Sequence, residues 1–217
     1  MAINIYNTLS KKKEKLEPRL PGEISMYICG LTVYNFMHIG NARTFINFDV
    51  IRRYLEFRGY QVNFVRNITD IDDKIIDRAA AEETTAQAIA EKYEAAFKSD
   101  ISRLDIKQPT EEPRATETIP EMIMLVEDLI DRGFAYENDG NVWFSVAKFG
   151  DYGRLSGQSL EHMRSGLRME PDPGKNDPAD FALWKKAKDG LFNKILFNQS
   201  PTGEEARGTI YINFTVR

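Results

Sequence analysis

The residues of this chain that are best suited to chemistry lie in one stretch, residues 26–74. It contains the only cysteine, Cys29, and one of the two histidines, His38. Both fall where a predicted strand runs into a predicted helix, and this is the edge at which open α/β sheets bind nucleotides. The stretch closes with Asn67-Ile68-Thr69-Asp70-Ile71-Asp72-Asp73-Lys74. We therefore expect these segments to assemble one nucleotide-binding site.

The string His38-Ile39-Gly40-Asn41 suits phosphate binding at the start of a helix. A phosphate at that position meets free backbone N–H groups and a favourable helix dipole. Gly40 lets the backbone approach a nucleotide because it has no side chain. The His38 imidazole can donate a hydrogen bond toward charge that grows on the α-phosphate. Taken alone, the string is weak, and a histidine that caps the helix or lies on the surface is the favoured interpretation.

Cys29 and the acidic segment each allow two interpretations. A free cysteine at a strand end is either a small buried hydrophobe or a thiolate ligand to zinc. The carboxylates of Asp70, Asp72 and Asp73 either bind magnesium or cap the next helix, and capping by Asp70 or Asp72 is the favoured interpretation. Thr69 lies at the end of the second predicted strand, where it can face a ligand.

Composition narrows the classes of protein that fit. The chain has 217 residues and a net charge of −4, so binding to nucleic acid through overall basic charge is excluded. The small basic clusters at 11–13 and 185–186 are interpreted as solvated surface. No apolar run approaches the roughly 18 residues that cross a bilayer, and the N-terminus lacks a signal-peptide pattern. With one cysteine and no internal disulfide, we expect a cytoplasmic protein without a membrane partner.

Apolar patterning predicts a strand, a buried helix and a second strand, which together form a βαβ unit. An extended lead-in precedes this unit, and further helices follow it. The turn signal Asn138-Asp139-Gly140 predicts a hairpin. The predicted elements are a lead-in over 1–25, strands over 25–29 and 62–65, helices over 44–57 and 73–83, a helix after a capping box at 84–87, a helix from 118 to a stop at Gly133, a hairpin over 134–146 and connecting loops over 148–180.

The later helices and the hairpin do not continue the alternation of strands and helices. The simplest fold class is α/β, with a Rossmann-type parallel sheet core interrupted by an inserted α+β connective segment. The predicted organisation is a first half of the core over 1–83, a connective insertion over 84–176, and a return to the core with a divergent tail over 177–217.

Taken together, these residues resemble cysteinyl-tRNA synthetase, a class I aminoacyl-tRNA synthetase, over roughly residues 1–190. The resemblance is carried by Met26-Tyr27-Ile28-Cys29-Gly30, His38-Ile39-Gly40-Asn41-Ala42-Arg43-Thr44, the run 65–76, Glu112-Pro113-Arg114-Ala115-Thr116, Tyr152-Gly153-Arg154-Leu155-Ser156 and the run 177–185. It implies a catalytic core with a His-Ile-Gly-His nucleotide-binding signature. It also implies that L-cysteine is activated with ATP and Mg²⁺ and transferred to tRNA(Cys).

The resemblance also implies roles for single residues. His38 and Asn41 match catalytic positions, and with Gly40 they match the ATP-binding signature, in which Asn41 replaces the second histidine. Cys29, Gly30 and Thr69 match the cysteine pocket, and Cys29 matches the first zinc ligand. Zinc would bind the substrate thiolate and so reject serine without an editing step.

The resemblance is expected to end after Gly190. The family continues with a second zinc cysteine, a histidine and a glutamate that complete the site, a Lys-Met-Ser-Lys-Ser loop and tRNA-binding domains. Residues 191–217 hold no Cys, His or Trp, so we expect an incomplete zinc site, an incomplete core and impaired activity. Residues 208–217 alternate like a single strand. The alternatives are a non-catalytic fragment that binds cysteine or nucleotide, a ligase that joins cysteine to an amino sugar, and a nucleotidyltransferase with a similar His-x-Gly signature.

Overall fold

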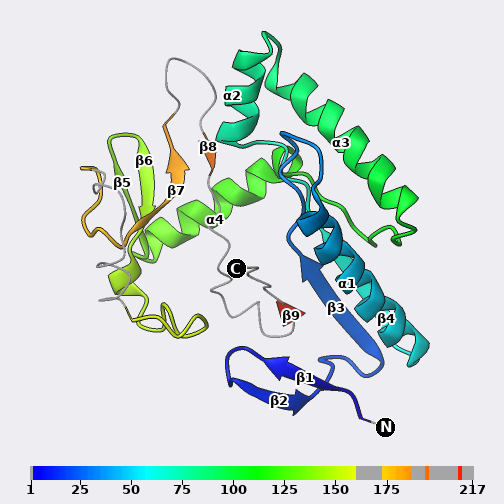
Figure 1. Ribbon diagram of the computed structural model, residues 1–217. Coiled ribbons are helices and arrows are strands. Elements are labelled where there is room, and N and C mark those ends of the chain that lie inside the picture. The colour runs from blue at the N-terminus through cyan, green and yellow to red at the C-terminus, as the bar shows by residue number, and fades with distance from the viewer. Residues whose placement is uncertain (1, 160–172, 187–193, 196–209, 212–217) are drawn as a thin grey trace. The chain divides into compact units, whose positions relative to one another are not determined.

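The computed structural model of the protein describes residues 2–159, 173–186, 194–195 and 210–211 (Figure 1). They form two compact units, which are described separately. The parallel unit contains residues 18–118 and 201–217, and the antiparallel unit contains residues 1–17 and 119–200. The boundaries at 83 and 176 expected from the sequence remain a prediction.

A βαβ arrangement forms the parallel unit, as the sequence predicts. Strand β3 (Glu23–Ile28), helix α1 (Ile39–Phe57) and strand β4 (Gln61–Arg66) follow one another, and β3 pairs with β4 in parallel. Strand β9 (Ile210–Tyr211) pairs in parallel with the other edge of β3, so the strand order is β4-β3-β9. Strand β9 lies within the strand predicted over 208–217, the rest of which falls outside the described residues.

The outer edge of β4 is also covered. Isolated parallel bridges join Val65 to Glu111 and Ile68 to Arg114. The backbone N–H of Arg66 donates to the carbonyl of Glu111 at 3.1 Å. Residues 110–115 therefore add a short backbone partner to the sheet, next to the loop that follows β4.

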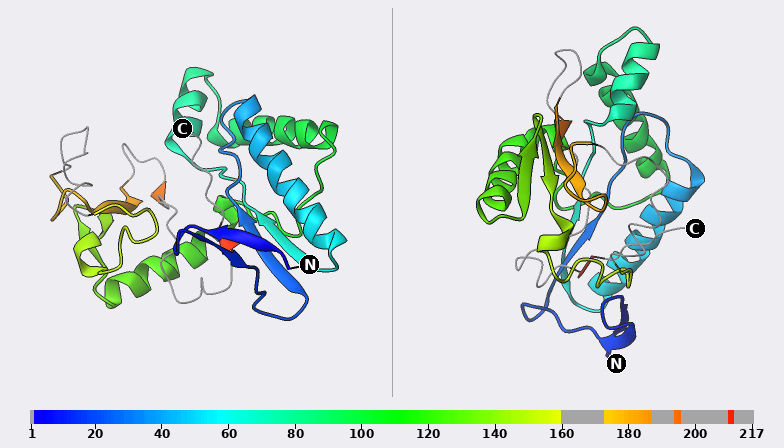
Figure 2. Two further views of the ribbon diagram at one scale, coloured as in Figure 1. Left: turned by 60° about the horizontal axis from the view of Figure 1, so that its bottom comes forward. Right: turned by 90° about the vertical axis from the view of Figure 1, so that its left-hand side faces the viewer.

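The spacing of apolar residues along each strand and helix determines which side chains form the core of the parallel unit. Alternate residues of β3 are buried, and α1 runs alongside β3 and β4 in each view (Figures 1 and 2). The rings of Phe45 in α1 and Phe97 in α3 (Ala86–Arg103) lie 5.2 Å apart. The buried side chains are those of Ile24, Met26, Ile28, Phe45, Phe48, Leu55, Val62, Phe64, Ile89, Tyr93, Phe97 and Ile101.

Helix α1 differs from the prediction in length and in burial. It begins at Ile39, well before residue 44, because His38 caps it. The prediction of a well-buried helix is wrong for one of its two apolar stripes. Ile46, Val50 and Phe57 are exposed, since the sheet and α3 contact only the stripe that carries Phe45.

Two capping residues determine where the next two helices begin. Helix α2 (Asp73–Ala81) begins after Asp72, and α3 begins after Thr85, whose hydroxyl accepts a hydrogen bond from the N–H of Ala88. The capping residue is thus Thr85 and not Thr84, one position later than predicted. The apolar residues of α3 are buried at the predicted spacing of three or four.

The antiparallel unit holds helix α4 (Ile119–Asp131), the 3₁₀ turn Val146–Lys148 and a four-stranded sheet. Asp139 and Gly140 both have positive φ, as the predicted tight hairpin turn requires. The sheet order is β5-β6-β7-β8, with β5 Ala135–Asn138, β6 Asn141–Phe144, β7 Phe181–Lys185 and β8 Lys194–Ile195. Its core is formed by Val126, Ala135, Val142, Phe144, Val146 and Leu183.

Two further segments of the antiparallel unit can be compared with the predictions from the sequence. Strands β1 (Asn4–Asn7) and β2 (Lys12–Lys15) form a hairpin where an extended lead-in was expected. Residues 160–172, part of the predicted loops and including His162, lie outside the described residues. Among the residues that the structure describes, no helix combines the length and apolarity needed to cross a membrane.

Candidate active site

The first part of the candidate site is the start of α1, where His38 acts as the helix cap. Its Nδ1 accepts hydrogen bonds from the backbone N–H groups of Gly40, at 3.0 Å, and Asn41, at 3.4 Å. The side-chain Oδ1 of Asn41 accepts in return from the N–H of His38 at 3.2 Å. This reciprocal pair is a capping box, which satisfies N–H groups that a helix start leaves without partners.

The cap determines which atoms a ligand can use. An imidazole nitrogen that accepts a hydrogen bond carries no proton, so the ring proton of neutral His38 is on Nε2. The exposed His38 can therefore donate through Nε2. The expectation that phosphate meets free N–H groups is wrong for Gly40 and Asn41, because His38 already binds both. Gly40 makes room for the ring, since a Cβ there would lie 2.8 Å from His38.

The second part lies where β3 and β4 end. The N–H of Gly30 donates to Oδ1 of Asn67 at 2.8 Å, and the Tyr27 hydroxyl donates to the same oxygen at 2.9 Å. A Cβ on Gly30 would lie 1.4 Å from the carbonyl oxygen of Asn67. Glycine is therefore required at position 30 by the close approach of two backbones, whether or not a ligand is bound.

Thr69 is held by its backbone and by its side chain. Its N–H donates to the carbonyl of Leu31 at 3.1 Å, and its carbonyl accepts from the N–H of Val33 at 3.2 Å. Its hydroxyl accepts from Nδ2 of Asn67 at 3.2 Å. The two strand exits are thus joined into one frame that contains Gly30 and Thr69. Among the described residues, no hydrogen bond joins this frame to the capping box of His38.

The acidic residues after Thr69 have structural partners. Asp72 accepts from the N–H of Lys74 at 3.0 Å, which confirms that it caps α2. Asp70 accepts from the backbone N–H of Thr116 at 3.0 Å and also from its hydroxyl. Asp70 therefore fixes the loop after β4 to the chain beyond residue 115 and does not cap α2.

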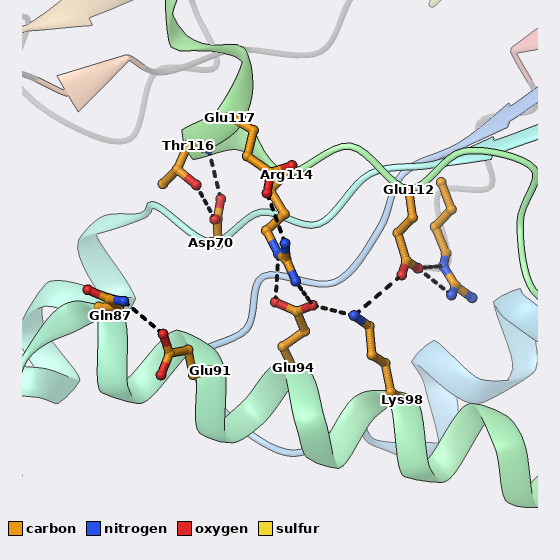
Figure 3. A network of polar contacts seen from close by, with 10 residues as sticks. Asp70, Gln87, Glu91, Glu94, Lys98, Glu112, Arg114, Thr116 and Glu117 are labelled. Carbon is orange, nitrogen blue, oxygen red and sulfur yellow. Dashed lines mark hydrogen bonds and ion pairs between the residues drawn. The ribbon is translucent and has the colours of Figure 1, made fainter.

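An ion-pair network supports this loop from α3 (Figure 3). The carboxylate of Glu94 accepts from Arg114 Nε at 3.0 Å and from Lys98 Nζ at 2.6 Å. Lys98 lies 3.9 Å from Glu112, which in turn binds Arg66. The hydrogen bond from Arg114 lowers the pKa of Glu94 and raises the pKa of Arg114, and Lys98 lowers the pKa of Glu94 further. The network therefore favours the charged form of the Glu94 carboxylate.

Sequence reasoning missed three residues of this arrangement, Asn67, Arg66 and Glu112. The strand register explains the position of Asn67. Ile28 pairs with Arg66, so Cys29 and Asn67 are the residues that follow directly at the ends of the two strands. An amide side chain at such a position can bind the neighbouring strand exit.

Cys29 follows β3 directly and is exposed. It is the one thiol of the chain. Within the described residues, no group of three or more His, Cys, Asp or Glu side chains could hold a metal ion. Because a zinc site takes about four ligands, the described residues do not fit a zinc centre.

Residues 15–208 match the family model described as "tRNA synthetases class I (C) catalytic domain". The chain belongs to this family. The match extends beyond Gly190, so the prediction that the family pattern ends there is wrong. That prediction depended on the absence of Cys, His and Trp landmarks after residue 190.

Two solved aminoacyl-tRNA synthetases are similar in structure to part of this chain. Methionyl-tRNA synthetase from Mycobacterium tuberculosis, in complex with methionyl-adenylate, matches 58% of this chain with a TM-score of 0.50 and 22% identity. LeuRS of Agrobacterium radiobacter K84, in a ternary complex with tRNA and LeuAMS, matches 61% of this chain with a TM-score of 0.48 and 19% identity. This chain spans 25% of the first protein and 18% of the second. The family match and the likeness to the methionyl-tRNA synthetase confirm the α/β, Rossmann-like fold class.

Proposed function

We propose that this chain carries the first half of a site that activates L-cysteine with ATP and transfers it to tRNA(Cys). The family supports amino-acid activation and tRNA charging in general. The observation that carries the proposal is the joining of the two strand exits by Asn67, which binds both Gly30 beside Cys29 and the hydroxyl of Thr69.

The ATP part of the proposal rests on the start of α1. The Nε2–H of His38 can donate to a phosphate oxygen, and the positive end of the helix dipole favours the negative charge that grows there. Asn41 holds the backbone of His38 through its Oδ1 and so helps to orient the ring. His38, Gly40 and Asn41 are the proposed ATP-binding residues, with Mg²⁺ bound to the ATP.

The cysteine part rests on Cys29, Gly30 and Thr69. The exposed thiol of Cys29 and the hydroxyl of Thr69 follow adjacent parallel strands at the same edge of the sheet. Ligands of open α/β sheets bind at the carboxyl ends of the strands. On the basis of the family, the proposal also includes a cytoplasmic location. It takes tRNA(Cys) as the acceptor of the cysteinyl group.

The test is cysteine-dependent ATP–pyrophosphate exchange by the purified, folded chain, together with calorimetric binding of a cysteinyl-sulfamoyl adenosine and its seryl counterpart. We expect tighter binding of the cysteinyl compound, and pyrophosphate exchange that depends on cysteine and not on serine but is slow, because the chain carries only the first half of the site. The variant Cys29→Ser removes the exposed thiol beside Gly30 and should weaken binding of the cysteinyl compound. The control Ser99→Ala changes an exposed residue of α3 and should behave as the wild type.

Each outcome selects one interpretation. Binding of the cysteinyl compound without exchange identifies a non-catalytic binding fragment. Exchange followed by transfer to an amino sugar, and not to tRNA, identifies the alternative ligase. A folded chain that neither binds nor exchanges contradicts the proposal.

A further inference from the structure

Asn67 uses both ends of its side-chain amide. Its Oδ1 accepts from the Tyr27 hydroxyl and from the N–H of Gly30, and its Nδ2 donates to the Thr69 hydroxyl. The two donors on Oδ1 determine which end of the amide faces β3. The Nδ2 group must therefore face Thr69.

This orientation decides what the hydroxyl of Thr69 can do. A hydroxyl has one hydrogen to donate and two lone pairs that accept. Because Nδ2 is a donor, it uses a lone pair of the Thr69 oxygen and leaves the hydrogen available. Among the described residues, that hydrogen has no acceptor. Backbone bonds to Leu31 and Val33 hold the residue itself in place.

We propose that Asn67 is a positioning residue that keeps the Thr69 hydroxyl as a hydrogen-bond donor to the bound amino acid. The inference rests on the proposed function, because it takes Thr69 as part of the cysteine pocket. The acceptor is a carboxylate oxygen of the substrate, since its α-ammonium group has no lone pair to offer.

The substitution Asn67→Asp tests this arrangement with little change in shape. One carboxylate oxygen can still accept from Tyr27 and Gly30, but the other cannot donate to Thr69. The Thr69 hydrogen then turns toward the introduced carboxylate and is lost to the substrate. Thr69→Val removes the same donor directly. The control Asn63→Asp makes the same chemical change at an exposed position of β4.

The measurement is the calorimetric Kd of the folded chain for L-cysteine and, separately, for ATP. We expect Asn67→Asp and Thr69→Val each to weaken cysteine binding about tenfold, the effect of losing one hydrogen bond to a charged group. The double variant should be no weaker than either single variant, because both remove one donor. ATP affinity should stay unchanged in all three, and Asn63→Asp should bind cysteine as the wild type does.

Two results would overturn the inference while the proposed function stands. One is that Asn67→Asp binds cysteine with wild-type affinity while Thr69→Val binds cysteine more weakly than the wild type. The other is an effect of about a hundredfold in the double variant, which would mean that the two residues act independently. If Asn67→Asp does not fold, Asn67→Ala takes its place, and its effect should vanish in the Thr69→Val background. A folded wild type that binds no cysteine removes the proposed function and this inference with it.

Discussion

The guanidinium group of Arg66 lies in the interior of the parallel unit and is bound by the carboxylate of Glu112, with Nε 2.8 Å from Oε1. Arg66 is 0% exposed, and its guanidinium carbon lies 5.5 Å from the ring centre of Phe45 and 4.9 Å from that of Phe97. Its Nη1 has no hydrogen-bond partner within the described residues. The ion pair joins the end of β4 to residues 110–115, so it supports the loop that carries Asn67.

Removing the carboxylate of this pair should destabilise the protein strongly. Glu112→Ala leaves the Arg66 charge buried without its partner, and we expect the free energy of unfolding to fall by about 3–5 kcal/mol. Glu117→Ala is the matched control, because its carboxylate is exposed and pairs with Arg114 at the surface. That change should cost at most about 1 kcal/mol. Urea unfolding of the full chain measures both, and equal losses would show that the buried pair is not a major contributor to stability.

The two roles of His38 can be separated by two substitutions. His38→Ala removes both the cap and the Nε2–H donor, so it should cost about 1 kcal/mol of stability and also lower pyrophosphate exchange. His38→Asn restores a capping acceptor in place of Nδ1, but its shorter side chain has no donor at the position of Nε2–H. It should unfold like the wild type and still lower exchange about a hundredfold. Full exchange activity in His38→Asn would show that the imidazole acts only as a cap.

Substitution of Gly30 should be more damaging than substitution of a glycine in open space. In Gly30→Ala the new Cβ would meet the Asn67 carbonyl at 1.4 Å, and the strand exits must separate. We expect the free energy of unfolding of Gly30→Ala to fall by about 3 kcal/mol or more. Gly59→Ala is the comparison, because Gly59 has a φ of +88° with no atom near its Cβ position. Gly59→Ala should lower the free energy of unfolding by about 1–2 kcal/mol, through backbone strain alone. Denaturant midpoints compare the two, and a smaller loss at Gly30 would contradict the close approach.

Acid should weaken the network around Glu94. The hydrogen bond from Arg114 lowers its pKa in the folded state below the ordinary 4.5. Its contribution to stability is therefore complete above pH 4.5 and is lost as pH falls through the lower folded value. Glu94→Gln should lower stability at neutral pH and flatten the acid limb of the stability curve. Glu91→Gln, an exposed change on the same helix, is the control. Identical curves for the two variants would contradict the role of Glu94.

Short sequence patterns were sufficient to predict several elements of the fold. Alternating apolar residues in β3 and β4, with an apolar helix between them, predicted the parallel βαβ unit that the structure contains. The Asn138-Asp139-Gly140 turn predicted the hairpin, because positive φ at two successive residues suits few sequences. The His38-Ile39-Gly40-Asn41 string marked the start of a helix, although its N–H groups are bound by His38 itself.

Other features depend on partners that are distant in the sequence. The sequence could not reveal that Arg66 is buried, because its partner Glu112 is 46 residues away and its aromatic neighbours come from two different helices. It could not choose which apolar stripe of α1 faces the sheet. The bond of Asn67 to Gly30 likewise requires two strand exits to meet.

The sequence by itself determined the family, the βαβ order and the candidate residues, since each follows from residue types and spacings within a short window. The tertiary structure alone decided which of these residues touch. That choice depends on how parallel strands and their covering helices bring distant segments together. In this protein it turned Asn67, which pattern reasoning had not singled out, into the link between Gly30 and Thr69.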